Sequence, residues 1–344
     1  MRFATDEELQ NWDDLLTSNP DGGNIFQGYE LAEHKQLGGW TPRYIKGESI
    51  AITAWEKPVF GLGKLWYLPK GPGTPTVTHL AGILPELKAF AREKGVFTVK
   101  MEPEILKTDE SVEKLAEQGL IKSSPIQPNF STILVDISPD LETIMASLNQ
   151  KGRHAIKRAE RDGVKAVAVE ATDENCRIFY ELLVGTAEGR FTIRSYDYLK
   201  KFWQRYANNG TGQLFFSYVD DQVVSGVFAL RMGTKSMYKD GASVRERPVY
   251  GASHLLQWRV IEWAKANGAL VHDLCGSTPS DQTKNEQHPF YGIYRFKSSF
   301  NKEVTDYVGA YDLVVRPLQS RIWQTVGERA VRRLHRRKYH EDWY

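Results

Sequence analysis

Two stretches of the chain, separated by about half its length, share one pattern. The first reads Ala89-Phe90-Ala91-Arg92-Glu93-Lys94-Gly95-Val96-Phe97-Thr98-Val99, and the second reads Glu262-Trp263-Ala264-Lys265-Ala266-Asn267-Gly268-Ala269-Leu270-Val271. Each reads as the end of an amphipathic helix, a glycine, and then a β-rich segment. Gly95 and Gly268 stand where a helix needs a left-handed residue to end. Because the copies lie so far apart, they predict two copies of one α/β fold rather than a short solenoid repeat.

Strand-like segments precede each copy. Residues 65–68 are apolar and lead into a turn rich in proline and glycine. Residues 214–219 and 223–230 are also largely apolar, and Asp220-Asp221 lies between them. This arrangement predicts a β-hairpin over an acidic turn.

The segment between the copies marks the expected domain boundary. Residues 133–136 read as a strand, after which Ser138 offers an N-cap with Pro139 at the first helical position. An apolar stripe follows, which we expect Gly152 to break into two helices, and Gly163 to end the second helix. We therefore predict a first domain of residues 1–137, with residues 307–344 packing back on it, and a second domain of residues 138–306.

Composition narrows the class of protein. The chain has 344 residues, of which 41% are hydrophobic and 26% are charged, as in soluble globular proteins. The first residues hold several acids and lack an apolar run, so a secretory signal is not expected. Cys176 and Cys275 are too few for a disulfide framework and lack metal-ligand spacing. We predict a cytoplasmic protein without a metal.

Basic residues gather in two runs although the net charge is only +2. The first run holds Lys151, Arg153, Lys157, Arg158, Arg161 and Lys165, and the second holds Arg329, Arg332, Arg333, Arg336, Arg337 and Lys338. A basic run is often simply a solvated helix face. Two such runs in a nearly neutral chain are also compatible with a polyanionic binding partner.

The common catalytic signatures are missing from the sequence. It lacks a Gly-x-Ser-x-Gly elbow, a P-loop lysine motif, a His-Glu-x-x-His motif and a Cys-x-x-Cys pair. What remains is a strand–turn–helix unit over residues 238–258. In acetyltransferases of the GNAT type, a glycine-rich loop at such a junction presents N–H groups to the pyrophosphate of CoA. Here Pro248 removes one donor and Tyr250 fills space, which favours a GNAT-like topology without the CoA loop over an ordinary helix start.

Several motifs, in this order and spacing, resemble the FemABX family. They are Tyr67-x-Pro69-x-Gly71-Pro72, Ile126-Gln127-Pro128, the basic stretch Asn149 to Ala159, Arg194-Ser195-x-x-Tyr198, Tyr238, Leu255-Leu256-Gln257-Trp258, Tyr291 to Phe300 and Tyr311-Asp312-Leu313-Val314. The resemblance implies an α/β fold built as a tandem duplication of two GNAT-like domains, with mixed sheets flanked by helices. It also implies transfer of an aminoacyl group from aminoacyl-tRNA to an amine of the peptidoglycan stem peptide, on a UDP- or lipid-linked precursor.

The resemblance assigns roles to individual residues. Lys35 and Arg194 match the family's contacts to the acceptor region, Tyr198 and Tyr238 match tyrosines of the acceptor groove, and Phe296 with Lys297 matches an aromatic–lysine pair near the donor ester. We expect Lys297 to be catalytic, because a cation there would stabilise the oxyanion of aminolysis. We expect Lys151, Arg153, Lys157, Arg158 and Arg161, and also the tail from Arg329 to Lys338, to contact the tRNA backbone. Glu102, Asp240 and Asp273 are candidate proton acceptors among which the sequence does not choose, and the ester oxygen or a tRNA hydroxyl is the alternative to all three.

Departures from the family pattern limit the assignment. The stretch between Glu188 and Phe202 is too short for the helical arm of some members, so the chain resembles the armless, FemX-like subset. Ser298-Ser299 replace a more glycine-rich sequence, and the tail is unusually basic. We expect a monomer without an organic cofactor, and a lipid-linked acceptor would bring it to the inner face of the membrane. The alternatives are a CoA-dependent N-acyltransferase, tRNA-dependent transfer to another acceptor, and a non-enzymatic RNA-binding module.

Overall fold

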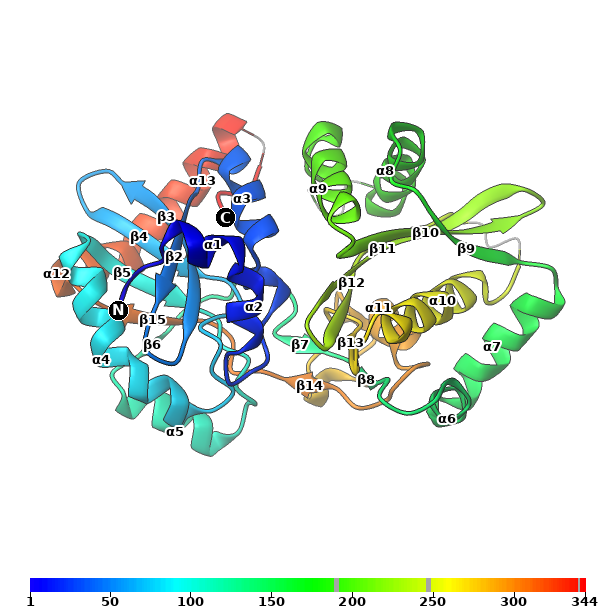
Figure 1. The fold of residues 1–344 in the computed structure, drawn as a ribbon, viewed down its shortest axis with the longest axis horizontal. Helices are drawn as coiled ribbons and strands as arrows, with labels where there is room; N and C mark the ends of the chain where they lie inside the picture. Colours follow the sequence, from blue (N-terminus) through cyan, green and yellow to red (C-terminus); the bar gives the residue numbers. More distant parts are fainter. Residues whose placement is uncertain (189–191, 246–248, 340) are drawn as a thin grey trace. The chain divides into compact units, whose positions relative to one another are not determined.

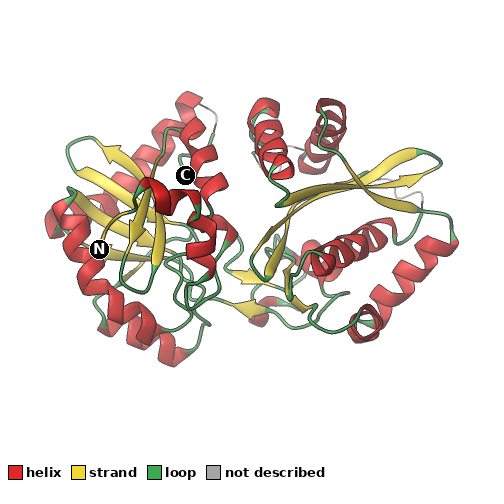
Figure 2. Ribbon diagram, viewed as in Figure 1, coloured by secondary structure: helices red, strands yellow, loops and turns green. Residues whose placement is uncertain are grey.

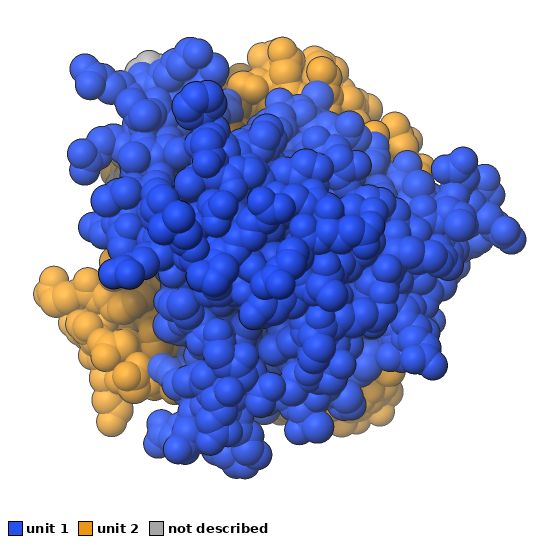
Figure 3. Space-filling view, turned by 90° about the vertical axis from the view of Figure 1, so that its left-hand side faces the viewer, with its two compact units in different colours: residues 1–130, 306–344 blue, residues 131–305 orange. Residues whose placement is uncertain are grey.

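The computed structural model describes residues 1–188, 192–245, 249–339 and 341–344. Within them the chain forms two compact units, the first from Met1–Phe130 with Asp306–Tyr344 and the second from Ser131–Thr305 (Figure 3). The short strands β7 (Ser131–Thr132) and β14 (Thr305–Asp306) lie where the chain passes between the units. The chain thus returns to the first unit after it completes the second. No helix among the described residues combines the length and apolar character that a membrane span requires.

The first unit is a mixed sheet with helices on its faces (Figures 1 and 2). Its strands, in spatial order, are β1 (Arg2–Phe3), β2 (Thr41–Lys46), β3 (Ala51–Val59), β4 (Gly63–Leu68), β5 (Val96–Met101), β15 (Tyr311–Val314) and β6 (Ile121–Lys122). Its helices are α1 (Asp6–Gln10), α2 (Trp12–Thr17), α3 (Tyr29–Lys35), α4 (Val77–Glu93), α5 (Asp109–Glu117), α12 (Pro317–Ile322) and α13 (Glu328–Tyr339), and a π-helical turn (Trp323–Gly327) joins the last two.

Successive side chains of β3 face opposite sides of this sheet. Ile52 and Ala54 belong to the apolar cluster that includes the buried leucines of α4. Thr53 and Trp55 point the other way, because successive strand side chains face opposite sides. On that second face, the indole of Trp12 donates a hydrogen bond to Thr53 Oγ1 at 2.8 Å.

The second unit repeats this architecture with a sheet of its own (Figure 1). Its strands, in spatial order, are β8 (Leu134–Asp136), β13 (Val271–Asp273), β12 (Lys235–Ser243), β11 (Gln222–Met232), β10 (Gly212–Val219) and β9 (Lys165–Val169). Its helices are α6 (Leu141–Ser147), α7 (Gln150–Arg161), α8 (Asp173–Ala187), α9 (Tyr196–Asn208), α10 (Ala252–Ala266) and α11 (Tyr291–Lys297).

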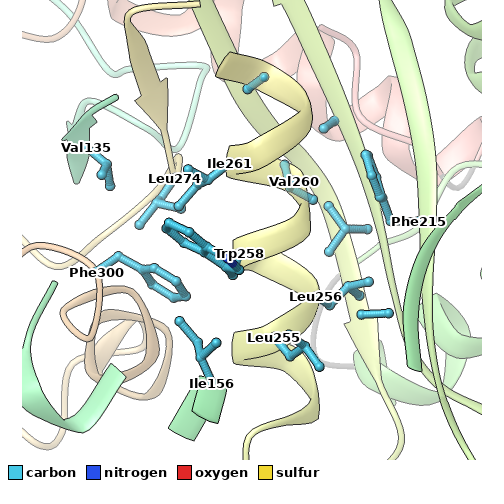
Figure 4. Close-up of a cluster of buried hydrophobic side chains, with 14 of the residues drawn as sticks. Val135, Ile156, Phe215, Leu255, Leu256, Trp258, Val260, Ile261, Leu274 and Phe300 are labelled. Carbon is cyan, nitrogen blue, oxygen red and sulfur yellow. The ribbon is translucent and has the colours of Figure 1, made fainter. Parts of the chain in front are cut away.

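The core of the second unit lies between its sheet and α10. Leu256 and Val260 of α10 share a buried cluster with Phe215 of β10, and the cluster continues to Ile156 of α7 and to Phe300 (Figure 4). The opposite face of the sheet is covered by α8 and α9, through aromatic contacts of Phe179 with Phe216 of β10 and of Trp203 with Phe228 of β11. The residues of α11 and of the loop after β13 are thus held against a packed layer.

The two units share one topology, which confirms the predicted tandem duplication of a GNAT-like fold. In the first unit, antiparallel strands lead to β4, and α4 connects it to the parallel strand β5. In the second unit, antiparallel strands lead to β12, and α10 connects it to the parallel strand β13. Gly95 and Gly268 follow the corresponding helices with φ of 79° and 85°, as the helix–glycine–strand pattern predicts.

The predicted hairpin is also confirmed. Strands β10 and β11 pair antiparallel on either side of Asp220 and Asp221, whose φ angles are 48° and 60°. Positive φ at both central residues is the geometry that matches the twist of a two-residue hairpin. Short polar side chains such as aspartate tolerate this conformation better than bulky ones.

The predicted details between the copies are partly wrong. The helix after β8 begins at Leu141 rather than at Pro139, because Asp140 accepts the capping hydrogen bond from Thr143 N at 2.8 Å. Ser138 instead hydrogen-bonds Asp136. The stripe does divide into two helices, but α6 ends at Ser147 and α7 begins at Gln150, so Gly152 lies inside a helix.

Candidate functional site

Lys297 ends helix α11 with its ammonium group buried in the second unit. The side chain is 6% exposed, and Nζ donates hydrogen bonds to the carbonyl oxygens of Cys275 and Gly276, each at 2.8 Å. Nζ also lies 5.5 Å from the ring centroid of Tyr238 on β12, within cation–π range. Two of the three ammonium donors are therefore used, and no oxygen among the described residues accepts from the third.

The loop after β13 sets the position of these two carbonyls. The Cys275 N–H donates to Asp273 Oδ1 at 2.7 Å, and the same carboxylate oxygen accepts a hydrogen bond from Thr132. Cys275 has a φ of 59°, in the left-handed region that residues other than glycine rarely occupy. Strained backbone of this kind is frequent at functional sites. Asp273 thus orients the turn that holds Lys297.

Burial lowers the pKa of Lys297 to about 8, although the charges of Cys275 and Asp273 oppose the shift. Desolvation disfavours the charged form of a base, which explains the direction. At neutral pH the ammonium form therefore still predominates. The side chain can act as a cation and can also exchange a proton near neutral pH.

A neutral histidine lies in the core behind this site. His272 of β13 is fully buried, and burial together with the charge of Lys297 lowers its pKa to about 3. Its Nδ1 lies 2.8 Å from Ser236 Oγ, and its Nε2 lies 2.7 Å from the amide nitrogen of Gln257. A second cation so close to Lys297 would be unfavourable, and the low pKa of His272 avoids it.

The side chain of Tyr238 lies over Gly241 of the same strand. A Cβ at Gly241 would lie 1.8 Å from the phenol oxygen of Tyr238, so the tyrosine occupies the space that glycine leaves open. Lys239 has no partner in the register with β11, in which Tyr238 pairs with Ala229 and Asp240 with Phe228. Such a bulge redirects side chains and is common next to active sites.

Arg194 and Tyr198, predicted to bind the acceptor, are brought together. The guanidinium carbon of Arg194 lies 5.3 Å from the ring centroid of Tyr198, one turn into α9. Tyr198 is also close enough to Lys239 to influence the pKa of that amine, which burial lowers and the Asp240 carboxylate more than restores. Tyr198 and Tyr238 therefore both lie near the bulged segment of β12.

Phe296 belongs to an aromatic cluster that reaches the basic helix α7. Its ring contacts His254 of α10 edge to face at 4.9 Å between centroids, and His254 in turn stacks on Tyr250 at 6.3 Å. The guanidinium of Arg158 lies 5.4 Å from the Tyr250 ring centroid. A continuous series of contacts thus connects the Phe296–Lys297 pair with one of the residues predicted to bind tRNA.

Two glycines let α7 approach this cluster closely. A Cβ at Gly152 would lie 2.2 Å from the carbonyl oxygen of Ser299, and a Cβ at Gly251 would lie 2.1 Å from that of Ala155. Asn149 also donates from its backbone to the Ser299 carbonyl, at 3.1 Å. The role of Gly152 is therefore close packing of α7 on the end of α11, which the sequence alone did not indicate.

The other residues of the basic run differ in their surroundings. Lys151 and Lys157 are exposed, and Arg161 is exposed and pairs with Asp162. Arg153 instead donates to the carbonyls of Ala146 and Leu148 at the end of α6. Its charge thus also stabilises a helix C-terminus.

Lys35 lies in the first unit, at the end of α3. Its Nζ is 4.9 Å from the ring centroid of Trp55, on the sheet face opposite α4. Trp55 contacts Tyr67 edge to face at 5.4 Å, and Tyr67 donates a hydrogen bond to Glu102. Lys35 is thus placed beside an aromatic surface of its own unit.

The three candidate proton acceptors all have structural hydrogen bonds. Glu102 lies in the first unit, where it also accepts from the backbone of Ile126 and Gln127. Asp240 accepts from the indole of Trp203 at 3.0 Å, and Asp273 holds the loop described above. Pro248, which the sequence argument used against a CoA loop, lies outside the described residues.

Comparison with known proteins identifies the family to which the sequence is similar. A model of the FemAB family matches residues 117–220 and 211–327. A lipid II:glycine glycyltransferase of Staphylococcus epidermidis is 22% identical over 89% of this chain and 91% of its own length, and that of Staphylococcus aureus is 22% identical over 92% and 94%. The crystal structure of FemX superposes with a TM-score of 0.78, at 18% identity, over 95% of this chain and 99% of that one.

The fold and these matches define a transferase built from two GNAT-like units. The chain belongs to the FemAB family, and the resemblance drawn from its sequence motifs is confirmed.

Proposed function

We propose that the protein transfers an aminoacyl group from aminoacyl-tRNA to a side-chain amine of the stem peptide of a peptidoglycan precursor, in the cytoplasm. The observation that carries the proposal is the contact series from Phe296, the residue that precedes the buried Lys297 in α11, through His254 and Tyr250 to Arg158. It joins a group suited to an ester carbonyl with a basic helix suited to RNA phosphates. The names of the related glycyltransferases support a lipid-linked acceptor.

The chemistry is aminolysis of an ester. The acceptor amine attacks the carbonyl carbon of the aminoacyl ester, a C–N bond forms, and the C–O bond to the tRNA ribose breaks. The remaining N–H of Lys297 would stabilise the oxyanion, an effect that is strong in a site from which water is excluded. The acceptor attacks as the free amine, after its ammonium form has released one proton to water. Because Asp240 and Asp273 already hold structural hydrogen bonds, we assign the second proton, which the nitrogen loses as the amide forms, to the leaving ribose oxygen.

The environment of α10 supports a donor other than CoA. Gly251 caps this helix with a φ of 92°, and the Ala155 carbonyl of α7 lies directly against it. A pyrophosphate bound at a helix N-terminus needs open access to the first N–H groups. A carbonyl oxygen at that end instead presents negative partial charge, which is unfavourable for a phosphate.

Lys35 and Arg194 are assigned to phosphates of the acceptor, and Tyr198 and Tyr238 to its peptide. Arginine offers a planar fork for phosphate oxygens and lysine a compact charge. Lys151, Lys157, Arg158 and Arg161 of the exposed α7 face are assigned to the tRNA backbone. The guanidinium of Arg153, which the sequence motif also assigns to the tRNA, donates instead to the end of α6.

One assay with the purified chain tests the acceptor. Charged tRNA is supplied with UDP-linked muropeptide, with lipid-linked muropeptide, or with the free stem peptide, and the product is examined by mass spectrometry. The proposal predicts one aminoacyl mass increment on a stem-peptide amine of a phosphate-bearing precursor. If charged tRNA is consumed only with an acceptor of another kind, the aminoacyl chemistry stands and the peptidoglycan assignment fails.

A further inference from the structure

The helical segment from Pro317 to Tyr339 carries a row of exposed apolar side chains. In this segment α12, the π-helical turn and α13 follow one another along the chain (Figure 1). Leu318, Ile322, Val326 and Leu334 are 69%, 41%, 62% and 65% exposed. They recur at spacings of four residues, with the small exposed Ala330 filling the remaining position. This spacing places them on successive turns of one helix face, and the wider π-helical turn reduces the sideways drift of the row.

The opposite face already anchors the segment to the first unit. Trp323 is fully buried and contacts Phe97 of β5 at 5.8 Å between ring centroids. The hydroxyl of Ser320 donates to the Phe97 carbonyl at 2.6 Å, and Gln324 donates to Asp312 at 3.0 Å. The exposed row is therefore not the face that holds the helix on the protein, and it remains available to a partner.

Arginines run alongside the apolar row. Arg321, Arg329 and Arg333 are exposed, and each immediately precedes a position of the row; Arg337, also exposed, follows four residues after Arg333. Within the described residues, no acidic side chain pairs with Arg333 or Arg337. Glu328, the acid of α13, is directed to Lys100 and Tyr344 of its own unit. The exposed surface thus combines a strip of positive charge with a strip of hydrocarbon.

We propose that this segment docks the protein on the surface of an anionic phospholipid bilayer. A cationic helix with an apolar face lies in the bilayer interface, where its apolar side chains enter the acyl boundary and its arginines reach the head-group phosphates. A tRNA backbone would engage the arginines but leave Leu318, Val326 and Leu334 in water. The apolar row therefore favours a bilayer over the RNA contact that the basic composition of the tail alone suggested.

The inference goes beyond the proposed transfer reaction and does not depend on it. Docking would bring the site to a lipid-linked acceptor, yet binding to vesicles needs neither donor nor acceptor. A failure of vesicle binding would leave the transfer reaction to be tested separately. A failure of transfer would leave the predicted vesicle binding unchanged.

The test measures sedimentation of the full chain with lipid vesicles. We expect binding to vesicles of phosphatidylcholine mixed with phosphatidylglycerol, weak binding to phosphatidylcholine alone, and loss of binding at high salt. Each arginine near an anionic surface strengthens binding about 5-fold, so Arg333→Gln with Arg337→Gln should weaken it about 25-fold. Val326→Ser with Leu334→Ser should weaken it at least about 10-fold, because less hydrocarbon is buried.

Matched variants decide between partners. Lys151→Gln with Lys157→Gln removes two charges from the other basic helix and should leave vesicle binding unchanged. The serine variant changes exposed residues and should unfold at the wild-type temperature. The proposal is overturned if the wild-type chain does not bind anionic vesicles, or if the serine variant binds them as tightly as the wild type. It is also overturned if Arg333→Gln with Arg337→Gln weakens tRNA binding but not vesicle binding.

Discussion

Replacing Lys297 by methionine removes the ammonium while keeping most of the side-chain volume. If this cation stabilises the oxyanion, kcat should fall by about 10²–10³, the usual effect of losing one such donor. Acceptor binding should change little, because the contact is made mainly in the transition state. The effect therefore appears in kcat rather than in KM.

The structure also predicts that this variant stays folded. The shift of the Lys297 pKa from its ordinary value to about 8 means that burial of the charged ammonium costs the wild-type fold roughly 3 kcal/mol. The variant regains this energy but leaves the carbonyls of Cys275 and Gly276 without their donor, at about 1–3 kcal/mol each. Because the two effects oppose each other, the free energy of unfolding should change by no more than about 3 kcal/mol.

The pH dependence provides a signature that a purely structural role would lack. The folded-state pKa of Lys297 is depressed, so the active ammonium is lost as the pH rises through about 8. The kcat/KM profile should therefore fall above that pH, and this limb should vanish in Lys297→Met. In the same window above pH 8 the unfolded chain binds more protons than the folded one, so wild-type stability should rise with pH relative to the variant.

The assay compares Lys297→Met with Lys302→Met, which removes an exposed lysine nearby. Single-turnover transfer from charged tRNA gives the rate, and urea unfolding gives the stability. The reasoning is refuted if Lys297→Met turns over at nearly the rate of Lys302→Met, or if both keep the same falling limb near pH 8.

The remaining predictions concern binding and packing. Lys35→Ala and Arg194→Ala should each raise KM for a phosphate-bearing acceptor, by roughly 1.5–3 kcal/mol in binding, and should have no effect with a phosphate-free stem peptide; equal impairment there contradicts the phosphate assignment. Arg158→Gln should reduce the slope of log tRNA affinity against log salt concentration by about 1. An unchanged slope would mean that the basic face of α7 is only solvated and does not bind tRNA. Gly152→Ala should lower the free energy of unfolding by about 1–3 kcal/mol, because its Cβ would meet the Ser299 carbonyl. Gly185→Ala in α8, where a Cβ meets nothing within 4 Å, should instead raise stability by about 0.5–1 kcal/mol in chemical denaturation.

The sequence predicts the fold where local chemistry decides it. Gly95 and Gly268 stop their helices because a left-handed residue is needed there, and Asp220-Asp221 closes a hairpin for a related reason. The start of α6 differs from the prediction because Asp140, rather than Ser138, provides the cap in the structure. The prediction that Gly152 breaks a helix is wrong because the glycine instead allows close packing against Ser299, which is distant in sequence.

The candidate site could be predicted only in part for the same reason. The motif resemblance identified Lys297 and Phe296, but the depressed pKa of Lys297 comes from burial, and its ammonium is held by two carbonyls of a loop that precedes α11. His254 and Tyr250 had no motif of their own, and only packing joins them to Phe296. The left-handed turn at Cys275 gave no signal, because glycine is the residue that normally marks such a conformation.

The measurement that tests the central claim most directly is the donor requirement of the purified protein. The acceptor precursor is incubated with charged tRNA, with charged tRNA pretreated with RNase, or with acetyl-CoA alone, and its mass is measured. The account predicts one aminoacyl increment in the first mixture and an unmodified acceptor in the other two. Acetylation of the acceptor by acetyl-CoA in an RNase-treated mixture would contradict it.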